Sequence, residues 1–205
     1  MRSRLFLVTP PDLVTGEQDL PRFSEALIKA LAAGDVASVL LQTGGGSEAL
    51  VRDAVVTLCP LVQDAEVAFL VEERADLVGE LGCDGVHVPA DAKKLGSLRT
   101  ALGSDLILGA DCSQSRHLGM VAGEASADYV CFDAQDKELL TWWSEVMEIP
   151  SIAWGGVTLK SAPEIIATGT DFLAVGDAIW THGAGPAVAI QAFNELIDRL
   201  DKSSD

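Results

Sequence analysis

The stretch 67–91 reads VAFLVEERADLVGELGCDGVHVPAD and contains a complete strand, helix and strand. The apolar run 67–71 predicts a buried strand, and 84–88 predicts a second one. Between them, one helical face carries Ala75, Leu77, Val78 and Leu81. Gly82 ends that helix, because glycine tolerates the left-handed conformation of a C-terminal cap. Strands joined by a helical crossover pair in parallel, so the stretch predicts one unit of a parallel sheet with a helix packed on it.

The same alternation of strand and helix runs through the whole chain. Further strands are predicted at 5–8, 36–41, 106–108, 129–132, 151–154 and 172–175. Further helices are predicted at 21–33, 47–61, 95–102, 115–124, 137–147, 162–168 and 186–200. This pattern predicts an α/β fold, a (β/α)8 TIM barrel in a single domain over residues 1–200, with a disordered tail at 201–205. An open doubly wound sheet is the alternative, but the Gly-x-Gly-x-x-Gly turn it needs is absent after the first strand.

The composition argues against several classes of partner and cofactor. Of the 205 residues, 48% are hydrophobic and 22% are charged, as in an ordinary globular domain. The formal net charge of −17 repels phosphate backbones and anionic lipids. We therefore expect a cytoplasmic protein that binds neither nucleic acid nor membrane. Four cysteines, at 59, 83, 112 and 131, show no CxxC spacing, which argues against a zinc or iron–sulfur site.

Acidic residues follow most of the predicted strands. Barrel enzymes place their working residues at the carboxyl ends of the strands. At those positions stand Thr9, Gln42, Glu72, Glu73, His87, Asp91, Asp111, Asp133, Trp154 and Asp177. Paired carboxylates such as Glu73 and Asp91 suit a hard divalent ion. The alternative interpretation is that these acids cap the helices that follow, since Asp is a preferred N-cap residue.

Glycines follow the last two predicted strands, where barrels commonly bind phosphate. Gly155 and Gly156 come after 151–154, and Gly176 and Asp177 open a short helical turn after 172–175. Glycines let backbone N–H groups approach an anion closely. His87 lies inside a predicted strand, which favours a hydrogen-bonded core residue. Trp154 and Trp180 flank the same two strands and are candidates for an aromatic face against a cationic heterocycle.

Six segments, taken together and in order, resemble one family. They are LFLVTPP at 5–11, LVEERADL at 70–77, DGVHVPAD at 84–91, ADYV at 127–130, AWGGV at 153–157 and LAVGDAIW at 173–180. They are similar to segments of thiamine phosphate synthase and its TenI relative, the thiazole tautomerase. The resemblance implies a (β/α)8 barrel that joins a pyrimidine diphosphate to a thiazole phosphate, with release of pyrophosphate and the help of Mg²⁺.

Compared with the family motifs, several positions in this chain carry a different charge. Gln42 and Gly44 stand where the synthases have the Arg and Lys that hold the pyrophosphate. Glu72 and Glu73 replace Asn-Asp, Asp111-Cys112-Ser113 replaces Ser-x-His, and Asp177 replaces a serine. The resemblance places substrate or phosphate binding at Gln42, Asp111, Gly155, Gly156, Gly176 and Asp177. It places Mg²⁺ at Glu73 and Asp91, where Asp91 is one residue from the family's second metal position.

These changes lead to two functional hypotheses. The first is a diverged thiamine phosphate synthase with weak synthase activity, because the pyrophosphate-binding cations are replaced. The second is a non-catalytic binding or regulatory homologue of the thiamine pathway, a pseudoenzyme whose acidic mouth takes a cation. Both hypotheses imply a small-molecule ligand. A homodimer is the oligomeric form to be tested.

Overall fold

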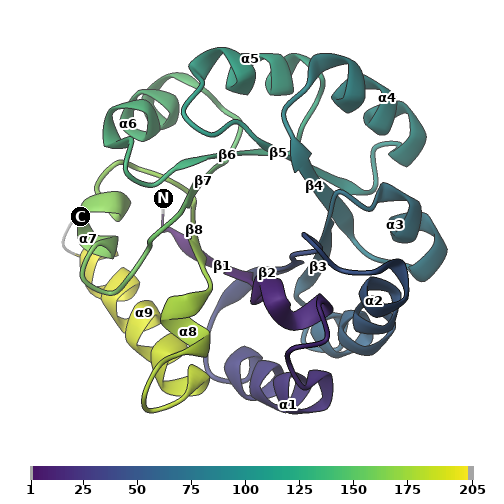
Figure 1. Ribbon diagram of the computed structural model, residues 1–205. Helices are drawn as coiled ribbons and strands as arrows, with labels where there is room; N and C mark the ends of the chain where they lie inside the picture. Colours follow the sequence, from purple (N-terminus) through teal and green to yellow (C-terminus); the bar gives the residue numbers. More distant parts are fainter. Residues whose placement is uncertain (1, 203–205) are drawn as a thin grey trace.

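A computed structural model describes residues 2–202, and its strands pair in sequence order and close into a ring (Figure 1). The ring confirms the predicted (β/α)8 barrel, with β1 paired in parallel to both β2 and β8. The strands are β1 (Arg4–Val8), β2 (Val36–Leu41), β3 (Ala68–Glu72), β4 (Gly85–Pro89), β5 (Ile107–Asp111), β6 (Tyr129–Asp133), β7 (Ser151–Trp154) and β8 (Phe172–Val175).

Helices surround the ring and cover its outer face (Figure 1). They are α1 (Leu20–Leu31), α2 (Glu48–Gln63), α3 (Ala75–Leu81), α4 (Ala92–Leu102), α5 (Arg116–Glu124), α6 (Lys137–Val146), α7 (Ala162–Ile166), α8 (Asp177–Trp180) and α9 (Pro186–Asp201), with a short 3-10 helix at Pro11–Val14. Gly82 caps α3 with φ of 73°, as predicted. The predicted tail overlaps the last residue of α9, and residues 203–205 lie outside the described part. Within residues 2–202, every helix is too short or too polar to span a bilayer.

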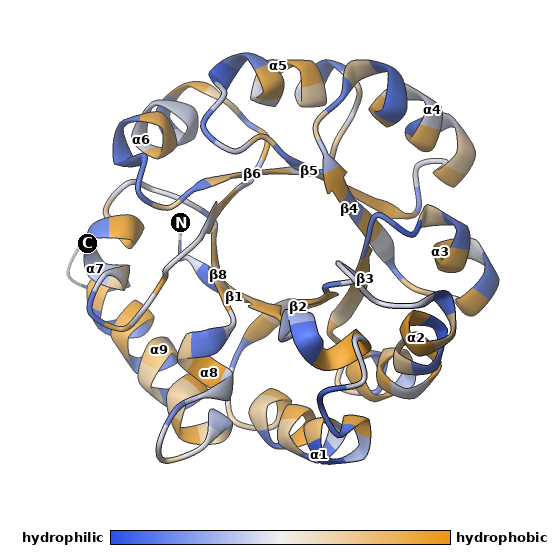
Figure 2. Cartoon of the chain, viewed as in Figure 1, coloured by the Kyte–Doolittle hydropathy of each residue, from blue (hydrophilic) through white to orange (hydrophobic). Residues whose placement is uncertain are grey.

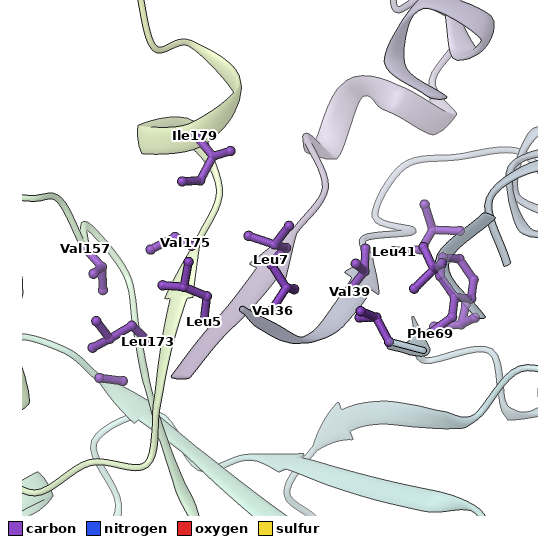
Figure 3. Packing of buried hydrophobic residues seen from close by; sticks show 14 of the residues in the cluster. Leu5, Leu7, Val36, Val39, Leu41, Phe69, Val157, Leu173, Val175 and Ile179 are labelled. Carbon is purple, nitrogen blue, oxygen red and sulfur yellow. The ribbon is translucent and has the colours of Figure 1, made fainter. Parts of the chain in front are cut away.

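Two layers of apolar side chains pack on either side of the strands. Along β1, Leu5 and Leu7 point outward to the helices, whereas Phe6 and Val8 point into the barrel, because successive side chains of a strand alternate in direction. Figure 3 shows the outer layer, in which Leu5, Leu7 and Val39 pack with neighbours from adjacent strands. In Figure 2 the strands are mostly orange, as expected for parallel strands buried on both faces.

Aspartates directly precede the even-numbered strands at the end opposite the carboxyl ends. Asp84, Asp128 and Asp171 each accept a backbone N–H from the preceding odd-numbered strand, at 2.7, 2.7 and 2.8 Å. Asp35 instead accepts hydrogen bonds from the guanidinium groups of Arg2 and Arg4, both at 2.6 Å. These carboxylates hold together the amino-terminal ends of the strands, and their role is structural.

The inner layer contains a side chain that crosses a neighbouring strand. His87, Gly109 and Tyr129 stand opposite one another on β4, β5 and β6. A Cβ atom on Gly109 would lie 2.0 Å from Cζ of Tyr129. The missing side chain of Gly109 therefore makes the room in which the Tyr129 ring passes over β5, and the Tyr129 hydroxyl lies 3.0 Å from Nδ1 of His87.

We expect Gly109→Ala to destabilise the fold, because the added methyl group and the Tyr129 ring cannot occupy the same space. Overpacking of this kind costs about 1–3 kcal/mol. Gly79→Ala is the matched control, since Gly79 lies in the exposed part of α3 with open space around it. The control should be neutral or stabilising by up to about 1 kcal/mol. Urea unfolding gives the free energy of unfolding of both variants. Equal values for the two would contradict the proposed packing of Tyr129 over Gly109.

Candidate functional site

The carboxyl ends of the strands surround a cleft at the mouth of the barrel. The cleft consists of two adjoining hollows of about 420 Å³ and 370 Å³, which share Gln42, Trp154 and Gly155. We call the two together the mouth cleft. Its lining includes all of the residues predicted to bind substrate or phosphate, namely Gln42, Asp111, Gly155, Gly156, Gly176 and Asp177. The sequence therefore predicted where these residues meet, while their binding roles stay predictions.

Glycines form one wall of the mouth cleft. Gly155 and Gly156 follow β7 with φ of 98° and 66°, a left-handed conformation that other residues rarely adopt. Gly176 lies across from them, at the start of α8. At these three positions the wall presents backbone rather than side chains.

Four carboxylates line the mouth cleft: Glu72, Asp111, Asp133 and Asp177. Three of them accept hydrogen bonds from neutral donors. Glu72 accepts the backbone N–H of Thr43 at 2.9 Å, and Asp111 accepts the backbone N–H of Ser113 at 2.8 Å. Asp133 accepts the side-chain amide of Gln114 at 2.8 Å, and Asp177 is exposed. Among the described residues, neither Lys nor Arg lines the mouth cleft. The carboxylates therefore make its field negative.

Glu73 and Asp91, the predicted metal ligands, lie beside the mouth cleft rather than in its lining. The Glu73 carboxylate is 3.4 Å from the ammonium of Lys94. Asp91 caps α4 and accepts the backbone N–H of Lys94 at 2.7 Å, so the capping interpretation is correct for this acid. Within residues 2–202, no three His, Cys, Asp or Glu side chains group closely enough to hold a metal ion.

His87 and Trp154 form the floor of the mouth cleft. The His87 ring is nearly parallel to the rings of Tyr129 and Trp154, at centroid distances of 5.7 and 5.5 Å and interplanar angles of 11° and 9°. His87 is 5% exposed and hydrogen-bonded to Tyr129, which confirms the prediction that it is a hydrogen-bonded core residue. It also lines the mouth cleft, in agreement with its place among the strand-end positions named from the sequence. Burial lowers the pKa of His87 to about 4, although the charges of Asp111 and Glu73 oppose this shift.

The prediction for Trp180 is wrong. Its indole N–H donates to the carbonyl oxygen of Val8 at 2.6 Å, and its ring packs on Phe23 of α1 at 4.9 Å. The reason is the short helix α8, which carries Trp180 away from the end of β8 and against α1. Trp154 remains as the aromatic residue of the mouth cleft.

Sequence reasoning assigned no role to two polar residues of the lining, Ser113 and Thr158. Ser113 and Thr158 lie in loops after β5 and β7, one or more residues beyond the strand ends on which the prediction depended. Cys131, which the sequence places near a strand end, also lines the mouth cleft from within β6. The position of Thr158 directly after the Gly-Gly-Val segment is the one sequence signal that favours it.

A family model described as thiamine monophosphate synthase matches residues 5–179. The chain belongs to this family. A thiamine-phosphate synthase of Rhodospirillum centenum is 44% identical over 95% of this chain and 97% of its own length. One of Hyphomonas neptunium is 38% identical over 97% of this chain and 96% of its own length. Both relatives match this chain over nearly its whole length.

A solved structure supports the synthase-family barrel independently. A thiamine phosphate pyrophosphorylase from Pyrococcus furiosus superposes with a TM-score of 0.81, and the match covers 96% of each chain. The two sequences are 21% identical, so this match concerns the fold alone. It agrees with the order of strands and helices described above.

We expect stability to fall between pH 7 and pH 4 because of His87. An unfolded His takes up a proton near pH 6.5, whereas the folded His87 does so only near pH 4. The unfolded state binds more protons in this window, so the free energy of unfolding falls as the pH falls. The contribution is about 2–3 kcal/mol by pH 4. Urea unfolding of the wild type and of His87→Gln measures it, since the difference between the two curves removes the effect of the other acids. If the free energies of unfolding of the two proteins changed with pH in parallel, the lowered pKa of His87 would be contradicted.

Proposed function

We propose that the mouth cleft binds a nitrogen heterocycle of the thiamine type, with a neutral or positively charged ring. We further propose that this chain joins the two phosphorylated family substrates slowly or not at all. The observation that carries the proposal is the charge of the lining: Glu72, Asp111, Asp133 and Asp177, with neither Lys nor Arg beside them among the described residues.

The charge of the lining disfavours a diphosphate. A carboxylate about 5 Å from a phosphate charge costs roughly 3 kcal/mol at an effective dielectric constant near 20. Even half of this cost lowers the affinity about tenfold. The same field attracts a cation, and the face of Trp154 is suited to a positively charged ring.

A second candidate function is the coupling reaction itself. It is supported by relatives named thiamine-phosphate synthase that match the whole chain, at 44% and 38% identity. The glycine wall at Gly155, Gly156 and Gly176 also supports it, because backbone N–H groups there can hold one phosphate group without a cation. Gln42 lies between that wall and the carboxylates and would contact either kind of ligand.

Mg²⁺ is part of the second candidate function, the coupling reaction. Glu73 and Asp91 are hard oxygen donors at the ends of neighbouring strands, which is the chemical type that Mg²⁺ accepts. Glu73 already holds a cation, the Lys94 ammonium. Glu73 and Asp91 would hold the ion, which supplies positive charge for a phosphate when bound. Lys94 has to leave Glu73 for this to happen, so the ion and the ammonium compete.

The coupling assay tests the first candidate function against the second. With the pyrimidine diphosphate, the thiazole phosphate and Mg²⁺, we expect turnover well below about 1 per second, the lower end of ordinary enzyme rates. The reason is the absence of cations at Gln42 and Gly44, together with the acidic lining. Formation of thiamine phosphate, measured by chromatography, gives the rate. Turnover of 1 per second or faster would show that the chain is an efficient synthase.

Charge-removing variants test the ligand. Thiamine is the probe because its thiazolium ring carries a positive charge. We expect Asp111→Asn/Asp177→Asn to weaken thiamine binding about tenfold or more, because two carboxylates near the cation are lost. The matched control is Glu25→Gln, which removes an exposed carboxylate on α1 away from the mouth cleft. Isothermal titration calorimetry measures both. Equal affinities in the double variant and the wild type, or no binding at millimolar thiamine, would contradict the proposal.

A further inference from the structure

A second hollow opens beside the mouth cleft, between α1 and α8, which lie next to each other outside the ring of strands (Figure 1). Its volume is about 960 Å³, which is larger than either hollow of the mouth cleft. One wall comes from residues 10–26 and the other from residues 177–186. We call this hollow the side groove. It shares Pro11 and Asp177 with the mouth cleft, so the two open side by side at the same rim of the barrel.

The floor of the side groove is apolar and fixed in shape. The rings of Phe23 and Trp180 pack on each other with their centroids 4.9 Å apart, and the Trp180 indole N–H donates to the carbonyl oxygen of Val8 at 2.6 Å. Phe23 is buried and Trp180 is half-buried, and both line the side groove. Three prolines also line it: Pro10, Pro11 and Pro186. Because these side chains are already held in place, a ligand does not have to order them when it binds, which lowers the cost of binding.

The rim of the side groove is acidic. Four carboxylates line it, those of Asp12, Glu17, Asp19 and Asp177. Among the described residues, Arg22 is the only cation in the lining. Asp12 is half-buried and accepts the side-chain amide of Gln18 at 2.9 Å, whereas the other three acids are exposed. A ligand therefore meets apolar rings at the floor and a negative field around them, and such a field attracts Lys and Arg side chains.

The size and the lining of the side groove favour a peptide segment as its occupant. Its volume of about 960 Å³ lies at the upper end of the range of small-molecule sites, roughly 300–1,000 Å³. Grooves lined by aromatic side chains are the sites at which proline-rich segments dock in the extended polyproline conformation. Proline suits such a floor because its ring is apolar and its backbone is already restricted before binding. The acidic rim then selects those segments that carry Lys or Arg beside the prolines.

We propose that the side groove docks a basic, proline-rich segment of a partner protein. The charge of the rim disfavours the other occupants. A second copy of this chain brings a formal net charge of −17 toward an acidic rim. Nucleic acids and anionic lipid surfaces meet the same repulsion. A basic, proline-rich segment gains from the apolar floor and from the acidic rim at once.

A synthetic peptide tests the role of the acidic rim. The probe is RRPLPRR with blocked ends, titrated by isothermal calorimetry. We expect Asp12→Asn/Glu17→Gln to bind it about fivefold more weakly than the wild type, since two exposed ion pairs are lost and each contributes little. The matched control is Glu25→Gln/Glu145→Gln, which removes two exposed carboxylates from α1 and α6 outside the side groove. Equal weakening in both double variants, or no binding to the wild type at millimolar peptide, would overturn the proposal.

A second peptide and one further variant test the floor. RRGSGRR keeps the charges of the first peptide and lacks its apolar residues, and we expect it to bind at least about tenfold more weakly. Equal binding of the two peptides would overturn the proposal. Ala26 of α1 lines the side groove and not the mouth cleft. Ala26→Arg should abolish binding of RRPLPRR, because it adds bulk and positive charge, and a melting temperature like that of the wild type shows that the variant is folded. Unchanged binding to this variant would place the peptide elsewhere and overturn the proposal.

Analytical ultracentrifugation of the wild type and of Ala26→Arg tests the alternative occupant, a second copy of this chain. We expect the same sedimentation coefficient for both proteins, since the side groove is not a contact between copies. A wild-type dimer that Ala26→Arg dissociates would assign the side groove to a second copy and overturn the proposal.

Discussion

The parallel pairing of β1 with β8 is the constraint on which the rest of the molecule depends. Once Arg4–Val8 lies beside Phe172–Val175, the sheet has no edge, and all carboxyl ends of its strands meet at one rim. Residues far apart in the chain then become neighbours. Thr9 accepts the backbone N–H of Gln42 at 3.0 Å, and Val8 and Asp177 line the same hollow. The mouth cleft therefore forms only when the barrel closes, and no single segment of the chain contains all of its lining residues.

The fold could be predicted from the sequence because its strands are apolar runs punctuated by glycine, as at 67–91. The rim could be predicted as well, since a strand end is a local feature. The contact at the floor of the mouth cleft could not be predicted. The contact between Tyr129 and His87 depends on the register of three strands and on the absence of a side chain at Gly109. The prediction for Trp180 failed for a related reason, because its contacts with Val8 and Phe23 depend on how α8 packs against other elements.

The family relationship rests on nearly the whole chain, whereas the proposed ligand rests on the mouth cleft alone. The relatives named thiamine-phosphate synthase match almost the whole chain, and their similarity includes the segments that build the barrel. The charges at the rim are a separate observation, since Glu72, Asp111, Asp133 and Asp177 line the mouth cleft and neither Lys nor Arg does so among the described residues. A barrel keeps its fold through the two apolar layers, and the rim side chains contribute little to either. Similarity over the full length therefore says less about the ligand than about the architecture.

The aspartates at the opposite end of the barrel have a further consequence. Asp84, Asp128 and Asp171 hold strand ends through backbone N–H groups, and Asp35 does so through Arg2 and Arg4. Each is tied to its place, because its loss would leave a donor at a strand end without its acceptor. At the rim, Glu72 and Asp111 also accept backbone N–H groups, but those of loop residues, Thr43 and Ser113, rather than of strand ends. Replacing an aspartate at the amino-terminal ends would therefore loosen the joint between two strands of the barrel, whereas replacing Glu72 or Asp111 at the rim would loosen a loop.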